Sequence, residues 1–211
     1  MKFILGTKEK MTTIYTDDGR AFAATIVSAT PGIVSQIKTA EKEGYNAVQI
    51  AGISKKESRV NKAQVGHTKM TGKGTAFKHF RELRERSGEL PKGVEVGAVV
   101  DVSAFAQGDK VEVSAISKSK GFTGVVKRHG FHGGPRSHGQ KHSERAPGSI
   151  GGSGGRAGGR VARGMRMAGR AGGERVTVRN LSILQVLPET NELVISGAIP
   201  GRRGTLVEIR G

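Results

Sequence analysis

The residues best suited to phosphate chemistry lie in segment 66–74, which reads GHTKMTGKG. A phosphate-binding loop has a shorter spacing between its first glycine and its Gly-Lys pair, and a Ser or Thr follows the lysine to bind magnesium. Here Gly74 takes the place of that hydroxyl residue, so no nucleotide site is predicted. We interpret the segment as a basic loop that contacts a nucleic-acid backbone through Lys69, Lys73 and Lys78.

Four histidines, His129, His132, His138 and His142, are the candidate metal ligands. The last two have a spacing that suits one face of a helix, but Pro135 disfavours a helix there. The chain has no cysteine to complete a zinc site, and carboxylates are nearly absent nearby. We therefore expect no metal, and expect these histidines to stack on bases or to donate hydrogen bonds to phosphates and 2′-hydroxyls.

An enzyme would need convergent acids, a nucleophile with its base, or a cofactor loop. Glu144 and Glu174 stand alone among cations, so we expect them to form ion pairs. Ser143 follows His142, but no acid is placed to orient the imidazole. The sequence therefore predicts no catalytic residues, no cofactor and no small-molecule substrate.

The positive charge is concentrated in residues 118–175, which we call the arm. The chain carries a net charge of +17, and these 58 residues hold 13 Lys and Arg against two acids. They also contain 17 of the 33 glycines and only eight Val, Ile, Leu, Met or Phe residues. So little apolar surface cannot offset the entropy of ordering the backbone. Alone in water, the arm should be unstructured or loosely extended.

Three uses of the arm can be compared. A linker does not need so many cations, and a membrane-surface segment needs an amphipathic helix, which the glycines disfavour. Nucleic acid remains, and the arginines favour folded RNA because a guanidinium grips phosphate in a bidentate manner and stacks on bases. We expect RNA contacts from Lys118, Lys120, Lys127, Arg128, His129, His132, Arg136, His138, Lys141, His142, Arg145, Arg156, Arg160, Arg163, Arg166 and Arg170.

Short β-branched or apolar runs flank the arm on both sides. They occupy 2–6, 12–16, 21–29, 33–38, 45–53, 94–102 and 110–116 before it, and 176–178, 181–187, 192–199 and 205–209 after it. Regularly spaced short strands with turn signals between them predict an antiparallel barrel or sandwich. We expect one β-barrel domain formed by 1–117 and 176–211, with 53–97 a partly irregular insertion and 118–175 the inserted arm.

Residues 75–86, TAFKHFRELRER, fit two structures. Phe77, Phe80 and Leu83 have the spacing of a short amphipathic helix, for which Thr75 is a possible N-cap. A strand fits equally well. The N-terminal apolar run is too short for a signal peptide, and no stretch approaches the roughly 20 apolar residues of a membrane span. We expect a soluble, cytoplasmic protein without membrane contact.

The arm carries specific motifs: KSKGFTGVVKRHGFHGGPR at 118–136, PGSIG at 147–151 and ERVTVRNL at 174–181. With GAIPGRRG at 197–204 and SATPGIVSQIKT at 28–39, they closely resemble the universal large-subunit ribosomal protein three family of the bacterial type. Further matching blocks are GTKEKMT at 6–12, GYNAVQI at 44–50, SHG at 137–139, GRV at 159–161 and MAG at 167–169. The resemblance covers nearly the whole chain in order.

The resemblance implies a six-stranded translation-protein β-barrel with a long basic Gly/Arg-rich loop extension. It implies a structural protein of the large subunit that binds 23S rRNA, above all its 3′-end domain, and acts early in subunit assembly. Its neighbours would include large-subunit proteins fourteen and nineteen. The loop tip would approach the peptidyl-transferase centre, and the residues at that tip would be Gly151, Gly152, Ser153, Gly154 and Gly155. It also implies that part of 75–86 is strand.

The chain departs from the family pattern at the tip. Residues 152–158 are richer in glycine and about two residues longer than is common in the family, and they contain no Gln that could be methylated. We hypothesise a more mobile tip whose contacts come from backbone and arginine. Lys10 replaces a usual glycine before Met11-Thr12. The alternative function is a free RNA-binding or RNA-chaperone protein, which would not stay with large subunits at stoichiometric ratio through high-salt washing.

Overall fold

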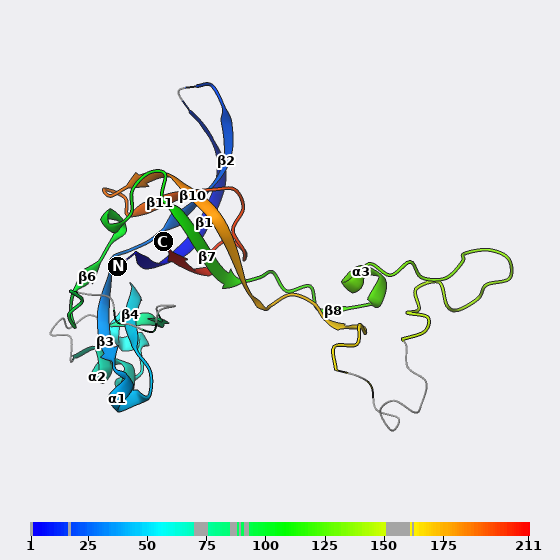
Figure 1. Cartoon of the computed structure of the whole chain (residues 1–211), viewed down its shortest axis with the longest axis horizontal. Helices are drawn as coiled ribbons and strands as arrows, with labels where there is room; N and C mark the ends of the chain where they lie inside the picture. The colour runs from blue at the N-terminus through cyan, green and yellow to red at the C-terminus, as the bar shows by residue number, and fades with distance from the viewer. Residues whose placement is uncertain are drawn as a thin grey trace. The chain divides into compact units, whose positions relative to one another are not determined.

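The computed structural model describes residues 2–16, 18–69, 76–84, 88, 90, 93–150, 161 and 163–211. The chain forms two compact units, drawn in Figure 1. Unit 1 consists of Met1–Ser117 and Arg175–Gly211, and unit 2 of Lys118–Glu174. No helix in the described part of the chain is long and apolar enough to cross a membrane.

Six antiparallel strands of unit 1 close into a barrel, in the order β1-β12-β7-β10-β11-β2. Closure gives each of these strands a partner on both sides, which removes the exposed edges of an open sheet. The prediction of a mainly β protein is confirmed. Of the two predicted architectures, barrel and sandwich, the structure has the barrel. The strands are β1 Phe3–Tyr15, β2 Ala21–Ser28, β7 Lys110–Ile116, β10 Arg175–Leu187, β11 Glu192–Ser196 and β12 Leu206–Arg210.

Two of the barrel strands are longer than the sequence runs that predicted them. β1 joins the runs 2–6 and 12–16, with a shift of register against β2 between Lys8 and Met11. β10 joins 176–178 and 181–187, and Asn180 adopts a positive φ at the corresponding shift against β7. Such irregularities bend a strand without ending it, so polar residues between two apolar runs need not be a turn.

Alternate residues of each barrel strand fill the barrel interior. On β12, Val207 and Ile209 are fully buried, whereas Glu208 between them is not. On β7, Val111, Val113 and Ala115 belong to the same core, although Ser114 between the last two is also buried. This period of two is what a sheet with one face on a core requires. The barrel core is completed by Ile4, Val27, Ala29, Val102, Phe105, Ile183, Leu193, Ile195 and Ile199.

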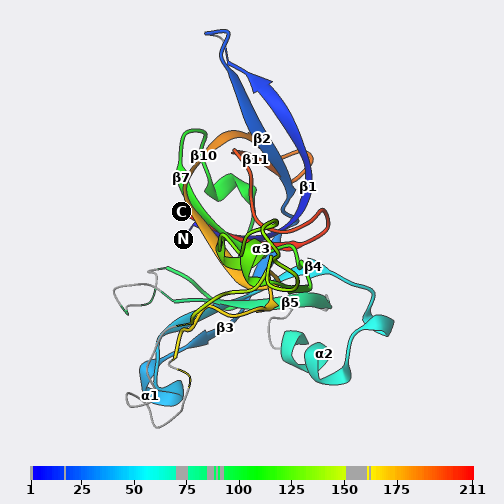
Figure 2. The same cartoon turned by 90° about the vertical axis from the view of Figure 1, so that its right-hand side faces the viewer.

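A second sheet lies beside the barrel within unit 1, as Figure 2 shows. It has four strands in the order β5-β4-β3-β6, namely β5 Phe77–Leu83, β4 Ala47–Ser54, β3 Gly32–Lys38 and β6 Val99–Val100. The runs 33–38 and 45–53 are therefore strands, as predicted, but they do not belong to the barrel. For the described part of 75–86, the alternative is resolved in favour of a strand, because residues 77–83 form β5, while 75 and 85–86 lie outside the described residues. A spacing of six residues places Phe77 and Leu83 on the same side of a strand, whereas the steps of three residues through Phe80 resemble a helix, and pairing with β4 decides between the two.

Strand β1 supplies both cores of unit 1. Ile4 belongs to the barrel core, whereas its neighbours Phe3 and Leu5 pack with Val48 and Ile50 of the second sheet. A strand covered on both faces has a continuous apolar run instead of an alternating one. This position of β1 between two cores explains why Phe3, Ile4 and Leu5 are apolar without alternation.

Four short helices in the described residues of unit 1 were not predicted. They are α1 Ala40–Glu43, α2 Lys62–Lys69 and the 3₁₀ helices Glu57–Arg59 and Val102–Ala104. The interpretation of 66–74 as a loop is wrong for its described part, because residues 66–69 form the last turn of α2. This helix has almost no apolar face, so hydrophobic periodicity could not reveal it. It depends on contacts with the second sheet.

Unit 2 has little regular structure in its described residues. It contains a two-stranded ribbon of β8 Phe122–Thr123 and β9 Gly169–Arg170, and a helix, α3 Val125–His129. Gly130 ends α3 in the left-handed conformation and donates its N–H to the carbonyl of Val126 at 3.0 Å. Only Val125 and Thr123 are buried among the described residues of this unit.

Candidate nucleic-acid interface

Two parts of the arm, the incoming limb (residues 118–150) and the returning limb (residues 163–174), are hydrogen-bonded to each other next to the residues through which the chain continues into unit 1. The N–H of Lys120 donates to the carbonyl of Ala171 at 2.9 Å, and the N–H of Ala171 donates to that of Gly121 at the same distance. Gly172 has a φ of +71°, and an added Cβ there would overlap the carbonyl oxygen of Lys118. The two limbs thus run close together at this point, and the approach depends on glycine at position 172.

A second link closes the incoming limb on itself. The N–H of Gly134 donates to the carbonyl of Glu144 at 2.9 Å, and the side chain of Glu144 pairs with the Arg136 guanidinium at 2.7 Å. The ion pair expected for Glu144 is thereby confirmed. A Cβ on Gly133 would overlap the same Glu144 carbonyl, so this close approach depends on glycine.

Helix α3 is tied to the returning limb through one carbonyl group. Arg128 donates from Nη1 to the Met167 oxygen at 2.7 Å, and His129 Nε2 lies 3.0 Å from the same oxygen. The guanidinium also lies against Gly169, where an added Cβ would be 2.9 Å from Nη1. These two residues therefore use part of their hydrogen-bonding capacity inside the arm. A guanidinium has five N–H donors, so Arg128 has further donors for a ligand.

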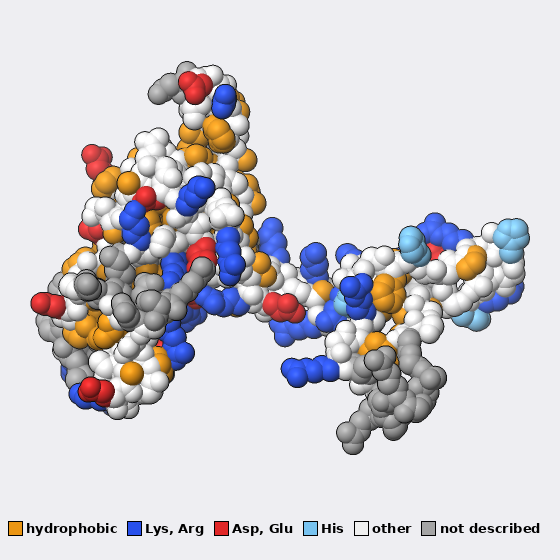
Figure 3. Space-filling model, viewed as in Figure 1, with side chains coloured by type: hydrophobic (Ala, Val, Ile, Leu, Met, Phe, Trp, Pro, Cys, Tyr) orange, Lys and Arg blue, Asp and Glu red, His pale blue; other side chains and the backbone are white. Residues whose placement is uncertain are grey.

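Nearly all predicted contact residues in the described part of the arm are exposed to solvent. His129 is half-buried, and the exposed ones are Lys118, Lys120, Lys127, Arg128, His132, Arg136, His138, Lys141, His142, Arg145, Arg163, Arg166 and Arg170. Figure 3 shows the Lys, Arg and His side chains on unit 2, with few acids among them. Arg156, Arg160 and the predicted tip residues 151–155 lie outside the described residues, as does Lys73 of unit 1.

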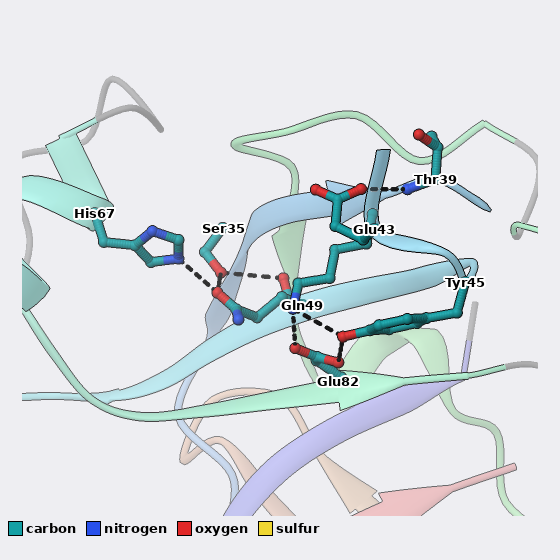
Figure 4. Close-up of polar contacts among 8 residues, drawn as sticks. Ser35, Thr39, Glu43, Tyr45, Gln49, His67 and Glu82 are labelled. Atoms are coloured by element: carbon teal, nitrogen blue, oxygen red, sulfur yellow. Dashed lines mark hydrogen bonds and ion pairs between the residues drawn. The ribbon is translucent and has the colours of Figure 1, made fainter. Parts of the chain in front are cut away.

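Lys69 is exposed at the end of α2, in unit 1, so it does not belong to the surface of the arm. A polar network, drawn in Figure 4, holds this helix on the second sheet. His67 Nε2 lies 2.6 Å from Gln49 Oε1, and Ser35 donates its hydroxyl to the same oxygen at 2.8 Å. His67 also packs edge-on against Phe80, with 5.5 Å between the ring centroids.

The same sheet face carries a charged pair next to this network. Lys38 Nζ donates to Glu82 Oε1 at 2.6 Å and to the Tyr45 hydroxyl at 2.9 Å, and that hydroxyl donates to Glu82 Oε2 at 2.9 Å. The hydrogen bond from Lys38 lowers the pKa of Glu82, with a smaller contribution from Tyr45. The bond to Glu82, and then that to Tyr45, raises the pKa of Lys38.

No three His, Asp or Glu side chains come together as metal ligands among the residues that the structure describes. The four histidines of the arm are instead spread along an exposed chain, apart from His129 at Met167. Their type and exposure suit stacking and hydrogen bonding to a nucleic acid.

The comparison with known proteins now decides the family. The sequence model described as Ribosomal protein L3 matches residues 29–196. The chain belongs to the ribosomal protein L3 family. Three relatives, each named "Large ribosomal subunit protein uL3", are 47%, 47% and 46% identical over 209, 209 and 211 residues. They come from Chlorobium phaeobacteroides, Carboxydothermus hydrogenoformans and Chloroherpeton thalassium. The alignments cover 99% of this chain in each case, and 98%, 96% and 98% of the relatives.

Membership of the ribosomal protein L3 family confirms the resemblance seen in the arm motifs. One basic surface of this L3-family chain was missed by the sequence analysis. It is a cleft in unit 1 whose arginines are Arg81, Arg84, Arg175, Arg179 and Arg210. They come from segments far apart in the chain, so no local run of charge signals them.

Proposed function

We propose that this protein is a structural constituent of the large ribosomal subunit that binds 23S rRNA, above all its 3′-end domain, through the arm. Membership of the ribosomal protein L3 family supports the assignment to the subunit. The observation that carries the binding mode is the exposure of nearly every cation on a unit with almost no buried apolar side chains. Such a surface is built for neutralising phosphates that RNA folding brings together.

The protein acts early in assembly of the subunit, and the arm orders on the RNA. The entropy lost by the glycine-rich backbone is offset by contacts to phosphates and bases. The tip, Gly151 to Gly155, extends toward the peptidyl-transferase centre and supports its structure without taking part in the reaction. Neighbouring proteins of the large subunit, fourteen and nineteen among them, contact the barrel unit. In this role the protein works in the cytoplasm and needs no cofactor.

A charge-removal variant that keeps the length of the arm tests the binding mode. Segment 140–165 contains Lys141, Arg145, Arg156, Arg160 and Arg163, and all five are changed to Gln. If about six cations of the wild type contact phosphates, log K for 23S rRNA should fall with log salt at a slope of roughly −4 to −5. The five-Gln variant should bind more weakly, with a slope shallower by roughly 3.5 to 4.5 when all five cations contact phosphates.

The matched control changes the four arginines of that set to lysine, which keeps the charge but removes the bidentate fork. It should retain the steep slope. A wild-type slope near zero would contradict the proposal. In cells, deletion of 140–165 should leave the barrel folded but impair maturation of the large subunit or peptidyl transfer, and normal subunits with normal activity in that mutant would also contradict it. Loss of the protein from large subunits during high-salt washing would favour the free RNA-binding alternative.

A further inference from the structure

A cleft in unit 1 gathers five arginines around three glutamates. Two adjoining cavities of about 450 and 380 Å³ share Arg175, Glu82 and Glu208 in their walls. Cavities of this size commonly hold a small ligand or a segment of a larger one. Most wall residues come from β5, β7, β10 and β12, with Phe3 from β1, so Arg81, Arg175, Arg179 and Arg210 are placed by strands of the barrel and of the second sheet, and Arg84 directly follows β5.

Each of two glutamates is shared between two arginines. Glu208 pairs with Arg81 at 2.7 Å and also with Arg175. Glu112 pairs with Arg179 at 3.5 Å and with Arg210 at 3.9 Å. At each of these two glutamates, two positive charges therefore meet one negative charge. Each guanidinium also has more N–H donors than it needs to bind one carboxylate.

Two of the carboxylates lie deeper than the guanidiniums of Arg175 and Arg179. The side chains of Glu208 and Glu112 are 14% and 23% exposed, whereas those of Arg175 and Arg179 are 60% and 69% exposed. A ligand entering from solvent therefore meets guanidinium groups first. The third glutamate, Glu82, is already bonded to Lys38 and Tyr45.

The cleft also contains the two ends of unit 1 that lead into the arm. Ile116, the last residue of β7, and Arg175, the first of β10, both line the larger cavity. Ser114 and Thr177 join the same two strands through a hydroxyl contact of 2.7 Å and line the other cavity.

We infer that this cleft binds phosphate groups of an RNA backbone at the root of the arm, with Glu208 and Glu112 holding the guanidiniums in position. The inference rests on the proposed function, because RNA that surrounds the arm must pass the residues from which the arm leaves. Ion pairs fix the long side chains before binding, so less rotamer entropy is lost when phosphate arrives. The same carboxylates repel phosphate and limit the affinity.

The part of the cleft around Glu112 suits phosphate better than an acidic protein segment, whereas the larger cavity also has Ala115, Ile116 and Leu206 in its walls. Around Glu112 the wall consists mainly of arginine, glutamate and hydroxyl side chains, with Phe3 and Leu83 as its apolar members. A protein partner would be held by burial of apolar and aromatic groups at the centre of the contact. A nucleic-acid backbone needs no apolar contact, because it is bound by charge-assisted hydrogen bonds to its phosphates.

The test uses the full-length protein and 23S rRNA in salt titrations. The variant R175Q/R179Q should bind about tenfold more weakly at fixed salt, with a slope shallower by roughly 1.4 to 1.8. The control R20Q/K42Q removes the same charge from exposed residues of unit 1 that line neither cavity, and it should stay within about twofold of the wild type. Thermal unfolding verifies that each variant is folded.

A second variant tests the role of the glutamates without removing an arginine. E208Q should bind the RNA about threefold more weakly than the wild type, because Arg81 and Arg175 lose the carboxylate that holds them in position, and this loss outweighs the relief of repulsion. Unchanged or tighter binding by E208Q would overturn the positioning role. Equal losses in R175Q/R179Q and in the control would overturn the site.

Failure of the cleft and failure of the proposed function give different results. If the wild type itself binds 23S rRNA without salt dependence, the proposed function fails, and the inference fails with it. If the wild type has the steep slope and R175Q/R179Q keeps it, only the cleft is wrong. Polyglutamate serves as the acidic-peptide probe, and its binding to the wild type but not to R175Q/R179Q, with rRNA binding unchanged, would assign the cleft to an acidic protein instead.

Discussion

Gly172 faces the carbonyl oxygen of Lys118 so closely that a Cβ on the glycine would overlap that oxygen. The contact joins the last residues of the returning limb to the first residue of the incoming limb. A residue at this place must have no side chain and must tolerate a φ of +71°. The root of the arm, where residues 118–121 meet 171–173, therefore depends on Gly172. Its sequence neighbours are alanine and glycine, so composition does not distinguish this glycine from the others.

Gly172→Ala should open the root of the arm. The left-handed conformation costs a residue with a Cβ about 1–2 kcal/mol, and the overlap with Lys118 adds to it. Hydrogen exchange at the amides of Lys120 and Ala171 should accelerate, while the barrel melts at the wild-type temperature. Gly124→Ala is the control, because an added Cβ there meets no atom within 4 Å and φ is not positive. Equal exchange rates in both variants would show that the root does not need Gly172.

Arg128 and Lys127 are neighbours with different expected roles. Arg128 donates to the Met167 carbonyl, whereas Lys127 is an exposed cation of α3. Arg128→Gln should weaken rRNA binding and also release α3 from the returning limb, seen as faster hydrogen exchange in α3. Lys127→Gln should lower affinity through charge alone, with a salt slope shallower by roughly 0.7–0.9. Unchanged exchange in Arg128→Gln would argue against the internal role.

Two glycines of unit 1 should respond to alanine in opposite directions. A Cβ on Gly6 would lie 2.5 Å from Val27 Cγ1 and 2.9 Å from the Ser28 oxygen, so Gly6→Ala overpacks the barrel wall. We expect a loss of about 1–3 kcal/mol in the free energy of unfolding. Gly66 lies within α2 with open space around it, and Gly66→Ala should gain about 0.5–1 kcal/mol. Urea denaturation measures both, and a destabilising Gly66→Ala would contradict the assignment of α2.

The Lys38–Glu82 pair should make unit 1 sensitive to acid. Because the folded protein lowers the pKa of Glu82, its contribution to stability is present above the unfolded pKa of about 4.5 and is lost as the pH falls through the folded value. The wild type should be more stable than Glu82→Gln at neutral pH, and this difference should disappear in acid. The variants Lys38→Met and Lys38→Met/Glu82→Gln complete a double-mutant cycle. A difference that does not change with pH would contradict the pairing.

Local patterns were sufficient for most strands and for the motifs of the arm. The alternation of Val207 and Ile209 with polar neighbours marks a strand by itself, because a strand turns successive side chains to opposite faces. The arm was recognised from its composition and motifs for a similar reason: charge and glycine content are local properties. Helix α2 was missed because it is held by the contact between His67 and Gln49, which are distant in the chain.

The sequence alone determined that the protein is mainly β, that it belongs with one ribosomal protein family, and that residues 118–175 are strongly basic. Those properties depend on residue type and spacing within short segments. The tertiary structure decided that strands 32–38 and 47–54 leave the barrel, and that Phe3 and Leu5 face a core different from that of Ile4. It alone brought Arg81, Arg175 and Glu208 into one cleft. The pairing of the strands depends on burial of both faces of β1. That burial requires residues from both ends of the chain, so it cannot be read from any short segment.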